Sequence, residues 1–330
     1  MRHLPKVIVF VLALALLQIT CKKTTPQANQ NANQTAANTA TPAPTVSEQE
    51  LQQVKQTFEK EMKDEPGNLH YNMGNVYVVA GKYQEAINEY QQALQIDPKD
   101  SDSYVHMGDA YLGLKQNDQA LAAYQKALAV NPKNADAYVH IGDFYSRANQ
   151  ADESLKAYRQ AVSMNPKDAT AQFRLGDALR HFGQPQEAVK AYQQAVRLKP
   201  DYAEAYFSLG NAYDQLNQPK QALDAYKNAA KYNDKDNDAW FNLGNSYNRL
   251  HQTDEAIKAL RKAIELKPDD ADARRVLGFL YLQQGDKRAA QEQYNALKSL
   301  NPQFAAALSD AINKPPDTTG KPVDTTKKQP

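Results

Sequence analysis

A glycine returns at one fixed interval along most of this chain, and no residue is inserted or lost between successive occurrences. The series comprises Gly74, Gly108, Gly142, Gly176, Gly210, Gly244 and Gly278. A fixed period of about 34 residues is typical of stacked helical repeats, in which each unit buries its apolar face only against its neighbours. The period constrains the fold more strongly than the length of 330 residues, which alone would suggest two globular domains.

Other positions keep the same period as the glycines. The second unit shows them all: Gly108 is followed by Ala120, Tyr124, Ala127 and Pro132. Across the units these places hold Ala or Ser, then Tyr or Leu, then Ala except in the last unit, then Pro except in the fifth. Small residues let two helix backbones approach, whereas Pro cannot extend the helix that precedes it. Because the apolar residues also recur at helical spacing, each unit is predicted to be a helix–turn–helix.

These repeated residues resemble the tetratricopeptide repeat family. The family pattern is an aromatic residue, Leu-Gly and Tyr, and later Ala, an aromatic residue, Ala and Pro, and it can be read in AWFNLGNSYNRL and DEAIKALRKAIELKP around Trp240. The departures from it are Gln172, Leu179, Asp234, Leu260, Arg274 and Leu297, and none breaks the register. The resemblance implies an all-α fold, a right-handed superhelical solenoid of seven tetratricopeptide helix–turn–helix repeats with capping helices.

Both ends of the repeat array carry segments that fit capping helices. Ser47 and Glu50 have the spacing of a capping box, and Phe304, Leu308 and Ile312 have helical spacing. The expected organisation is a signal peptide at 1–20, a disordered tether at 21–46, an N-terminal capping helix at 47–66, repeats at 67–100, 101–134, 135–168, 169–202, 203–236, 237–270 and 271–304, a C-terminal capping helix at 305–313 and a disordered tail at 314–330.

The N-terminus predicts where the protein works. Arg2 and Lys6 precede an apolar run over 7–17, which has the length of a signal-peptide core, and Cys21, the one cysteine, follows four positions later. Residues 22–46 are rich in Gln, Asn, Thr, Ala and Pro, a composition that cannot bury enough surface to fold. Together these features resemble a bacterial lipoprotein, in which the signal is cleaved before Cys21 and the cysteine is lipidated.

The lipoprotein signal departs from the family pattern, since Gln18, Ile19 and Thr20 precede the cysteine. A cleaved secretory signal with a free cysteine and an uncleaved signal anchor are the alternatives. The expected location is the bacterial cell envelope, lipid-anchored, with the repeats in the periplasm or outside the cell. Lys22 favours the outer membrane, because inner-membrane retention in enterobacterial lipoproteins uses an aspartate at that position.

The sequence offers no pattern for catalysis or for a cofactor. No Ser/His/Asp arrangement, zinc motif or phosphate loop is recognisable, and a net charge of +1 gives no basic stripe for nucleic acid. His106 and His140 occupy equivalent places in adjacent repeats and are interpreted as solvated helix-face residues, because a metal would need further ligands. The protein is therefore predicted not to be an enzyme, with no cofactor, no metal and no nucleic-acid partner.

Function is instead expected on a surface. In tetratricopeptide proteins the first helix of each unit lines a concave, peptide-binding groove, and the positions three before and one after each glycine share one helical face. The predicted groove residues are Tyr71, Asn75, Val105, Asp109, Val139, Asp143, Phe173, Asp177, Phe207, Asn211, Phe241 and Asn245. The residues three before each glycine form an apolar row, which would accept ligand side chains: Tyr71, Val105, Val139, Phe173, Phe207 and Phe241. The residues one after each glycine form a polar row, which would bond an extended backbone: Asn75, Asp109, Asp143, Asp177, Asn211 and Asn245. Asp109, Asp143 and Asp177 suggest a preference for Lys or Arg in the ligand.

The predicted function is a membrane-tethered, monomeric scaffold that binds extended peptides or partner proteins and assists assembly of a cell-envelope complex. Two alternatives stay open: a self-assembling structural solenoid, and a secreted or periplasmic adaptor without lipid. The family's clamp for a C-terminal carboxylate is not expected, because it needs Lys where this chain has Tyr71, Val105 and Phe173.

The predicted lipid anchor can be tested directly. Cells that express the chain should incorporate radiolabelled palmitate into it, and the Cys21→Ala variant should lose the label because no other cysteine is present. Labelling that survives this substitution would contradict the lipoprotein interpretation.

Overall fold

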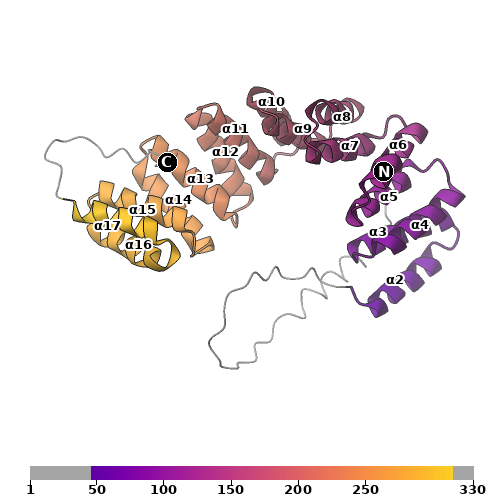
Figure 1. The fold of residues 1–330 in the computed structure, drawn as a ribbon, viewed down its shortest axis with the longest axis horizontal. Helices are drawn as coiled ribbons and strands as arrows, with labels where there is room; N and C mark the ends of the chain where they lie inside the picture. The colour runs from indigo at the N-terminus through magenta and orange to yellow at the C-terminus, as the bar shows by residue number, and fades with distance from the viewer. Residues whose placement is uncertain (1–45, 315–330) are drawn as a thin grey trace. The chain divides into compact units, whose positions relative to one another are not determined.

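The computed structural model describes residues 46–314, and within them every regular element is an α-helix (Figure 1). The signal peptide, Cys21 and nearly all of the predicted tether and tail lie outside the described residues. The described residues include no helix that is long and apolar enough to cross a membrane. The chain divides into two compact units, unit 1 up to Ile141 and unit 2 from Gly142, each of which is described by itself.

The helices follow the predicted periodicity. Those that begin in unit 1 are α2 (Glu48–Glu61), α3 (Pro66–Val79), α4 (Tyr83–Ile96), α5 (Ser101–Gly113), α6 (Asn117–Val130) and α7 (Ala135–Arg147), whose second half belongs to unit 2. Those of unit 2 are α8 (Ala151–Met164), α9 (Ala169–His181), α10 (Pro185–Leu198), α11 (Ala203–Gln215), α12 (Pro219–Tyr232), α13 (Asn237–Arg249), α14 (Thr253–Leu266), α15 (Ala271–Gln283), α16 (Lys287–Leu300) and α17 (Pro302–Asn313). Consecutive helices pack in pairs, as is typical of a tetratricopeptide solenoid.

The periodic glycines make room for one aromatic ring in each of the first five repeats. A methyl group at Gly176 would lie 2.7 Å from the ring of Tyr192, and one at Gly210 would lie 2.6 Å from the ring of Tyr226. The same contact joins Gly74, Gly108 and Gly142 to Tyr90, Tyr124 and Tyr158. Real Cβ atoms do not approach other atoms this closely, so only glycine lets the second helix of the repeat place its tyrosine against the first.

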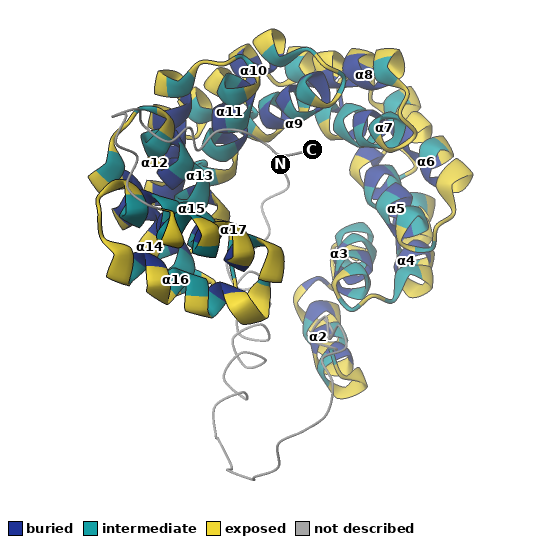
Figure 2. Cartoon of the chain, turned by 60° about the vertical axis from the view of Figure 1, so that its left-hand side comes forward, coloured by how far each residue is buried: buried dark blue, intermediate teal, exposed yellow. Residues whose placement is uncertain are grey.

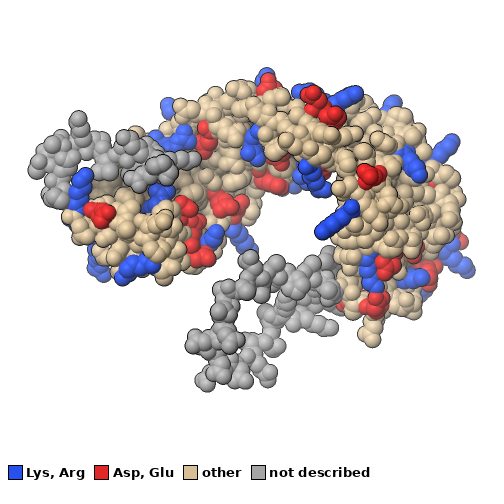
Figure 3. Space-filling model, in the orientation of Figure 1, with Lys and Arg blue, Asp and Glu red and all other residues tan. Residues whose placement is uncertain are grey.

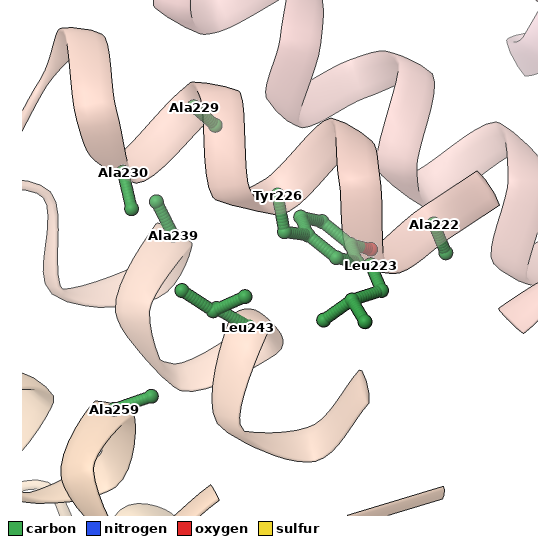
Figure 4. Close-up of a cluster of buried hydrophobic side chains, with 8 residues drawn as sticks. All are labelled: Ala222, Leu223, Tyr226, Ala229, Ala230, Ala239, Leu243 and Ala259. Atoms are coloured by element: carbon green, nitrogen blue, oxygen red, sulfur yellow. The ribbon is translucent and has the colours of Figure 1, made fainter. Parts of the chain in front are cut away.

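Small residues surround this contact and form the core. The periodic alanines on either side of the tyrosine are almost completely buried, as at Ala222 and Ala229 beside Tyr226. In unit 2, Ala230 on α12 faces Ala239 and Leu243 on α13 (Figure 4). Buried and exposed residues alternate along each helix (Figure 2), as expected when one side packs and the other meets solvent.

Each turn within a repeat contains one residue in the left-handed backbone region, seven positions after the periodic glycine. These residues are Gly81, Lys115, Asn149, Gly183, Asn217, His251 and Gly285, with φ between 53° and 81°. Gly and Asn adopt this conformation at little cost and end helices in this way, so five of the seven fit the turn. Lys115 and His251 adopt it against their own preference, which shows that the repeat imposes the turn.

The N-terminal helix covers the first repeat. The side chain of Ser47 accepts a hydrogen bond from the backbone N–H of Glu50, and the Glu50 carboxylate accepts one from the N–H of Ser47 at 2.8 Å, so the predicted capping box is confirmed. Leu51, Val54 and Phe58 are buried in one cluster with residues of α3. Helix α2 therefore removes from water an apolar face that would otherwise end the array.

The C-terminal helix begins earlier than predicted, at Pro302 rather than at 305. Asn301 caps it by accepting hydrogen bonds from the N–H groups of Gln303 and Phe304, both at 3.1 Å. Most earlier repeats place an Asp or Asn cap two positions after the periodic proline, as at Asp168, but the last repeat has Phe304 there. Proline is tolerated at the first helical position, so α17 starts at once instead of after a turn.

The last two repeats replace the tyrosine contact. Leu260 takes the place of the ring against Gly244, and Leu308 of α17 lies against Gly278, where a methyl group would approach its Cδ2 atom to 2.5 Å. Tyr294, which the period assigns to this place, is only partly buried. Helix α17 thus completes the core of the seventh repeat as well as covering it.

Two glycines in helix α3 test the role of the close contact. Gly74→Ala forces a methyl group against Tyr90, so we expect the free energy of unfolding to fall by about 1–3 kcal/mol. Gly67→Ala in the same helix meets nothing nearer than Ile96 Cγ2 at 3.5 Å, and its better helix propensity should leave stability unchanged or raise it by up to about 1 kcal/mol. Urea unfolding followed by circular dichroism measures both; equal effects would contradict the packing argument.

Candidate functional site

The polar row predicted to line the groove binds the buried tyrosines. The hydroxyl of Tyr90 donates to Asn75 Oδ1 at 2.7 Å, and that of Tyr226 donates to Asn211 Oδ1 at 2.7 Å. The same bond links Tyr124 with Asp109 at 2.7 Å, Tyr192 with Asp177 at 2.6 Å, and Tyr158 with Asp143. Asn245 has no such donor, because Leu260 occupies the tyrosine position.

This bond gives the polar row a role within the fold that the sequence analysis missed. The constant spacing between acceptor and tyrosine, the same in every one of these pairs, was a usable signal. These side chains are half-buried, so each keeps one edge toward solvent while its other edge satisfies a tyrosine hydroxyl. Their predicted role in binding a ligand stays a prediction.

The apolar row is more deeply buried than predicted at two positions. Val105 is 2% exposed and Phe173 is 3% exposed, and the Phe173 ring packs against Tyr192 and Tyr202 with centroids 5.9 and 5.1 Å away. The structure therefore corrects the expectation that the side chain of Val105 accepts a ligand, and it leaves only a small part of Phe173 exposed, at the lining of a groove. Four other members of the row, Tyr71, Val139, Phe207 and Phe241, are half-buried and reach the surface.

In unit 1 two histidines share one carboxylate. The Nδ1 atom of His140 lies 3.0 Å from Oδ1 of Asp109, and that of His106 lies 3.6 Å from Oδ2. The His140 ring also stacks on Tyr124, with centroids 5.3 Å apart. The side chains of His106 and His140 keep 40% and 30% of their surface exposed, in keeping with helix-face residues, and they also join consecutive repeats through Asp109.

The pKa of the Asp109 carboxyl is lowered from its ordinary value and that of Asp177 is raised, although both residues follow a periodic glycine. Burial alone would raise the pKa of Asp109, but the close approach of His106 and His140 and the hydrogen bond from Tyr124 outweigh it and hold that pKa well below its ordinary range. Burial raises the pKa of Asp177, and its hydrogen bond with Tyr192 and nearby arginine charges do not offset this. The two groups therefore contribute to stability in different pH ranges.

Asp→Asn substitutions should separate these effects, because Asn is the native residue at the equivalent positions 75 and 211 and keeps the tyrosine bond. Asp109, whose folded pKa is depressed, should stabilise the wild type above about pH 3.9, and this advantage over Asp109→Asn should vanish as the pH falls through its folded pKa. Asp177, whose folded pKa is raised, should favour the wild type over Asp177→Asn at low pH and lose that advantage as the pH rises. Urea unfolding between about pH 3 and 7 measures both; parallel trends would contradict the assignment.

Unit 2 contains a groove of about 540 Å³, which runs along the first helices of successive repeats. It is lined by residues of α7, α8, α9 and α11: Asp143, Ser146, Arg147, Tyr158, Phe173, Arg174, Asp177, Ala178, Arg180, His181, Glu204, Phe207, Ser208 and Asn211. Five of the predicted site residues are among them: Asp143, Phe173, Asp177, Phe207 and Asn211. The structure thus brings these five together around one space large enough for several side chains of a ligand.

Charge in this groove is mixed rather than acidic. Arg147, Arg174 and Arg180 accompany the carboxylates of Asp143, Asp177 and Glu204. On the face drawn in Figure 3, basic and acidic side chains are likewise interspersed. Over residues 46–314, no group of three or more His, Cys, Asp or Glu side chains could hold a metal ion. The side chains that line the groove are able to form hydrogen bonds and ion pairs with a ligand.

Comparison with protein families matches nearly the whole repeat array. Models described as TPR repeat match 74–115 and 108–148, one described as tetratricopeptide repeat matches 135–168, and one described as cilia and flagella-associated protein 70 C-terminal domain matches 167–300. The chain is a tetratricopeptide repeat protein. This repeat fold supports a protein–protein interaction scaffold. A search of curated proteins finds no match.

Solved structures of other tetratricopeptide proteins are similar to this chain. PilF of Pseudomonas aeruginosa matches with a TM-score of 0.55 and 19% identity, over 64% of this chain and 99% of PilF, which shows the fold alone. YrrB, described as a TPR protein with an unusual peptide-binding site, matches with a TM-score of 0.48 and 25% identity, over 56% of this chain and 95% of YrrB. MamA matches with a TM-score of 0.47 and 27% identity, over 50% of this chain and 97% of MamA.

Proposed function

We propose that this tetratricopeptide protein is a scaffold without catalytic activity that binds an extended segment of a partner protein in the groove of unit 2. The observation that carries this proposal is the groove itself, which gathers residues of α7, α9 and α11 around about 540 Å³. An extended peptide exposes backbone donors and acceptors along its length, and the groove offers both kinds of partner, for example in Asn211, Ser146 and Arg174.

The residues at the base of the groove are held in place by the fold before any ligand binds. Phe173 is buried at its floor, and the Phe207 ring meets Tyr226 in an edge-on contact with centroids 5.8 Å apart. Asp143, Asp177 and Asn211 are held in place by tyrosine hydroxyls. Side chains fixed in this way lose little conformational freedom when a ligand binds, which lowers the entropic cost of association.

We further propose that the scaffold works in a bacterial cell envelope, attached through a lipidated Cys21, where it assists assembly of an envelope complex. The support is the sequence: an apolar run of signal-peptide length over 7–17, one cysteine at position 21 and a polar segment over 22–46. A tether of this kind would let a monomeric repeat domain reach partners in the periplasm or outside the cell, with the outer membrane favoured by Lys22.

A bulky residue in the groove tests the binding proposal. Ser146 lines the groove, so Ser146→Trp should fill it and abolish capture of the partners that the wild-type chain retains from detergent-solubilised membranes of the source cells. Ser163 on α8 is exposed and does not line the groove, so Ser163→Trp makes the same change elsewhere and should retain those partners. Quantitative mass spectrometry of the captured proteins gives the readout, and equal capture by both variants would refute binding in this groove.

A further inference from the structure

Three arginines reach the groove of unit 2 from two consecutive first helices. Arg147 lies in the last turn of α7, whereas Arg174 and Arg180 lie on either side of Asp177 along α9. All three side chains line the same space. Guanidinium groups present several N–H donors in a fixed plane that matches a carboxylate, so their convergence is a recognition feature.

These guanidinium groups are not used by the fold as ion-pair partners. The described residues include several ion pairs, such as Arg249 with Asp214, but none involves Arg147, Arg174 or Arg180. The Nε atom of Arg180 is buried and has no hydrogen-bond partner among residues 46–314. Donor capacity is therefore left over inside the groove, and an unsatisfied buried donor of this kind favours a ligand that can accept from it.

Two acidic side chains of the groove, in contrast to the arginines, already have hydrogen-bond partners within the fold. Asp143 accepts from the hydroxyl of Tyr158, and Asp177 accepts from that of Tyr192 at 2.6 Å. Burial raises the pKa of Asp177 even though Arg180 and Arg174 lie near enough to lower it. Among the described residues neither arginine forms an ion pair with this carboxylate, and Arg180 also interacts with the hydroxyl of Tyr192. Neither guanidinium group is therefore neutralised by a carboxylate of the fold.

We propose that the groove binds an extended acidic segment of the partner, whose Asp or Glu carboxylates are held by Arg147, Arg174 and Arg180 while an apolar side chain contacts Phe207. This inference deepens the proposed function and rests on it. It also reverses the preference for basic ligands that the row of Asp109, Asp143 and Asp177 suggested, because those carboxylates are already engaged within the fold.

A peptide array provides the test. The full chain, purified in mild detergent, is applied to ten-residue peptides of Ser and Ala that carry one Phe and two Glu residues at every mutual spacing, beside matched Gln and Lys arrays. Retention should be highest on Glu peptides. For the best Glu peptide, fluorescence anisotropy should give a Kd that rises about tenfold or more in Arg174→Gln/Arg180→Gln and that rises with salt between about 0.05 M and 0.5 M.

The matched control is Arg159→Gln/Arg197→Gln, which removes the same charge from exposed positions of α8 and α10 outside the groove and should leave the Kd within about twofold. Circular dichroism checks that both variants keep the wild-type helix content, and the single variant Arg147→Gln, at an exposed position, serves if the double variant does not fold. Equal retention of Glu and Gln peptides, preference for Lys peptides, or equal loss in control and groove variants would overturn the proposal.

The failure of this inference can be told apart from failure of the proposed function. If Ser146→Trp abolishes partner capture but Glu peptides have no advantage, the groove binds a partner and only its acidic character is wrong. If Ser146→Trp has no effect and Glu peptides have no advantage, both are wrong.

Discussion

Each of the first five repeats depends on a tyrosine ring that lies directly against the backbone of a glycine. The ring fills the volume that any side chain at Gly108 or Gly176 would need, and its hydroxyl then emerges beside the next residue, Asp109 or Asp177, to which it donates. One residue pair therefore sets the distance between the two helices and fixes a polar side chain at the surface. Core packing and the presentation of the groove are consequences of the same contact.

Much of the fold followed from the sequence because this contact repeats without a change in spacing. The period located the helices, and the spacing of Ser47 and Glu50 located the capping box. The start of α17 was missed because it depends on which residue caps the helix: Phe304 stands where most other repeats have Asp or Asn, so the cap moved to Asn301. Periodicity predicts only what the repeats share, and the last repeat lacks the Asp or Asn cap that most of the others have.

The candidate site was less predictable, since it depends on how neighbouring helices cover one another. Val105 and Phe173 have the helical phase of surface residues, yet adjacent helices bury both. The carboxylates beside Gly108 and Gly176 look alike in sequence, but His106 and His140 contact Asp109, whereas Asp177 has the hydroxyls of Tyr192 and Ser208 and no histidine partner. Position within the repeat predicted where these groups lie; their charge state depends on partners that come from other helices.

The residues that distinguish one part of the array from another lie beside the constant contacts, and some of them, such as His106 and His140, make contacts of their own. The place two before the glycine is His106 and His140 in successive repeats and then Arg174, and the place four after it is Leu112, Ser146 and Arg180. Because Gly, Ala and Tyr already hold the helices together, these positions can change charge without changing the fold. The tyrosine-bonded acids supply a fixed surface, and the arginines beside them, which form no ion pair among the described residues, give one stretch of that surface its own chemistry. Under the proposed function, ligand choice would therefore depend on the variable positions, whereas the constant ones set how rigidly those positions are held.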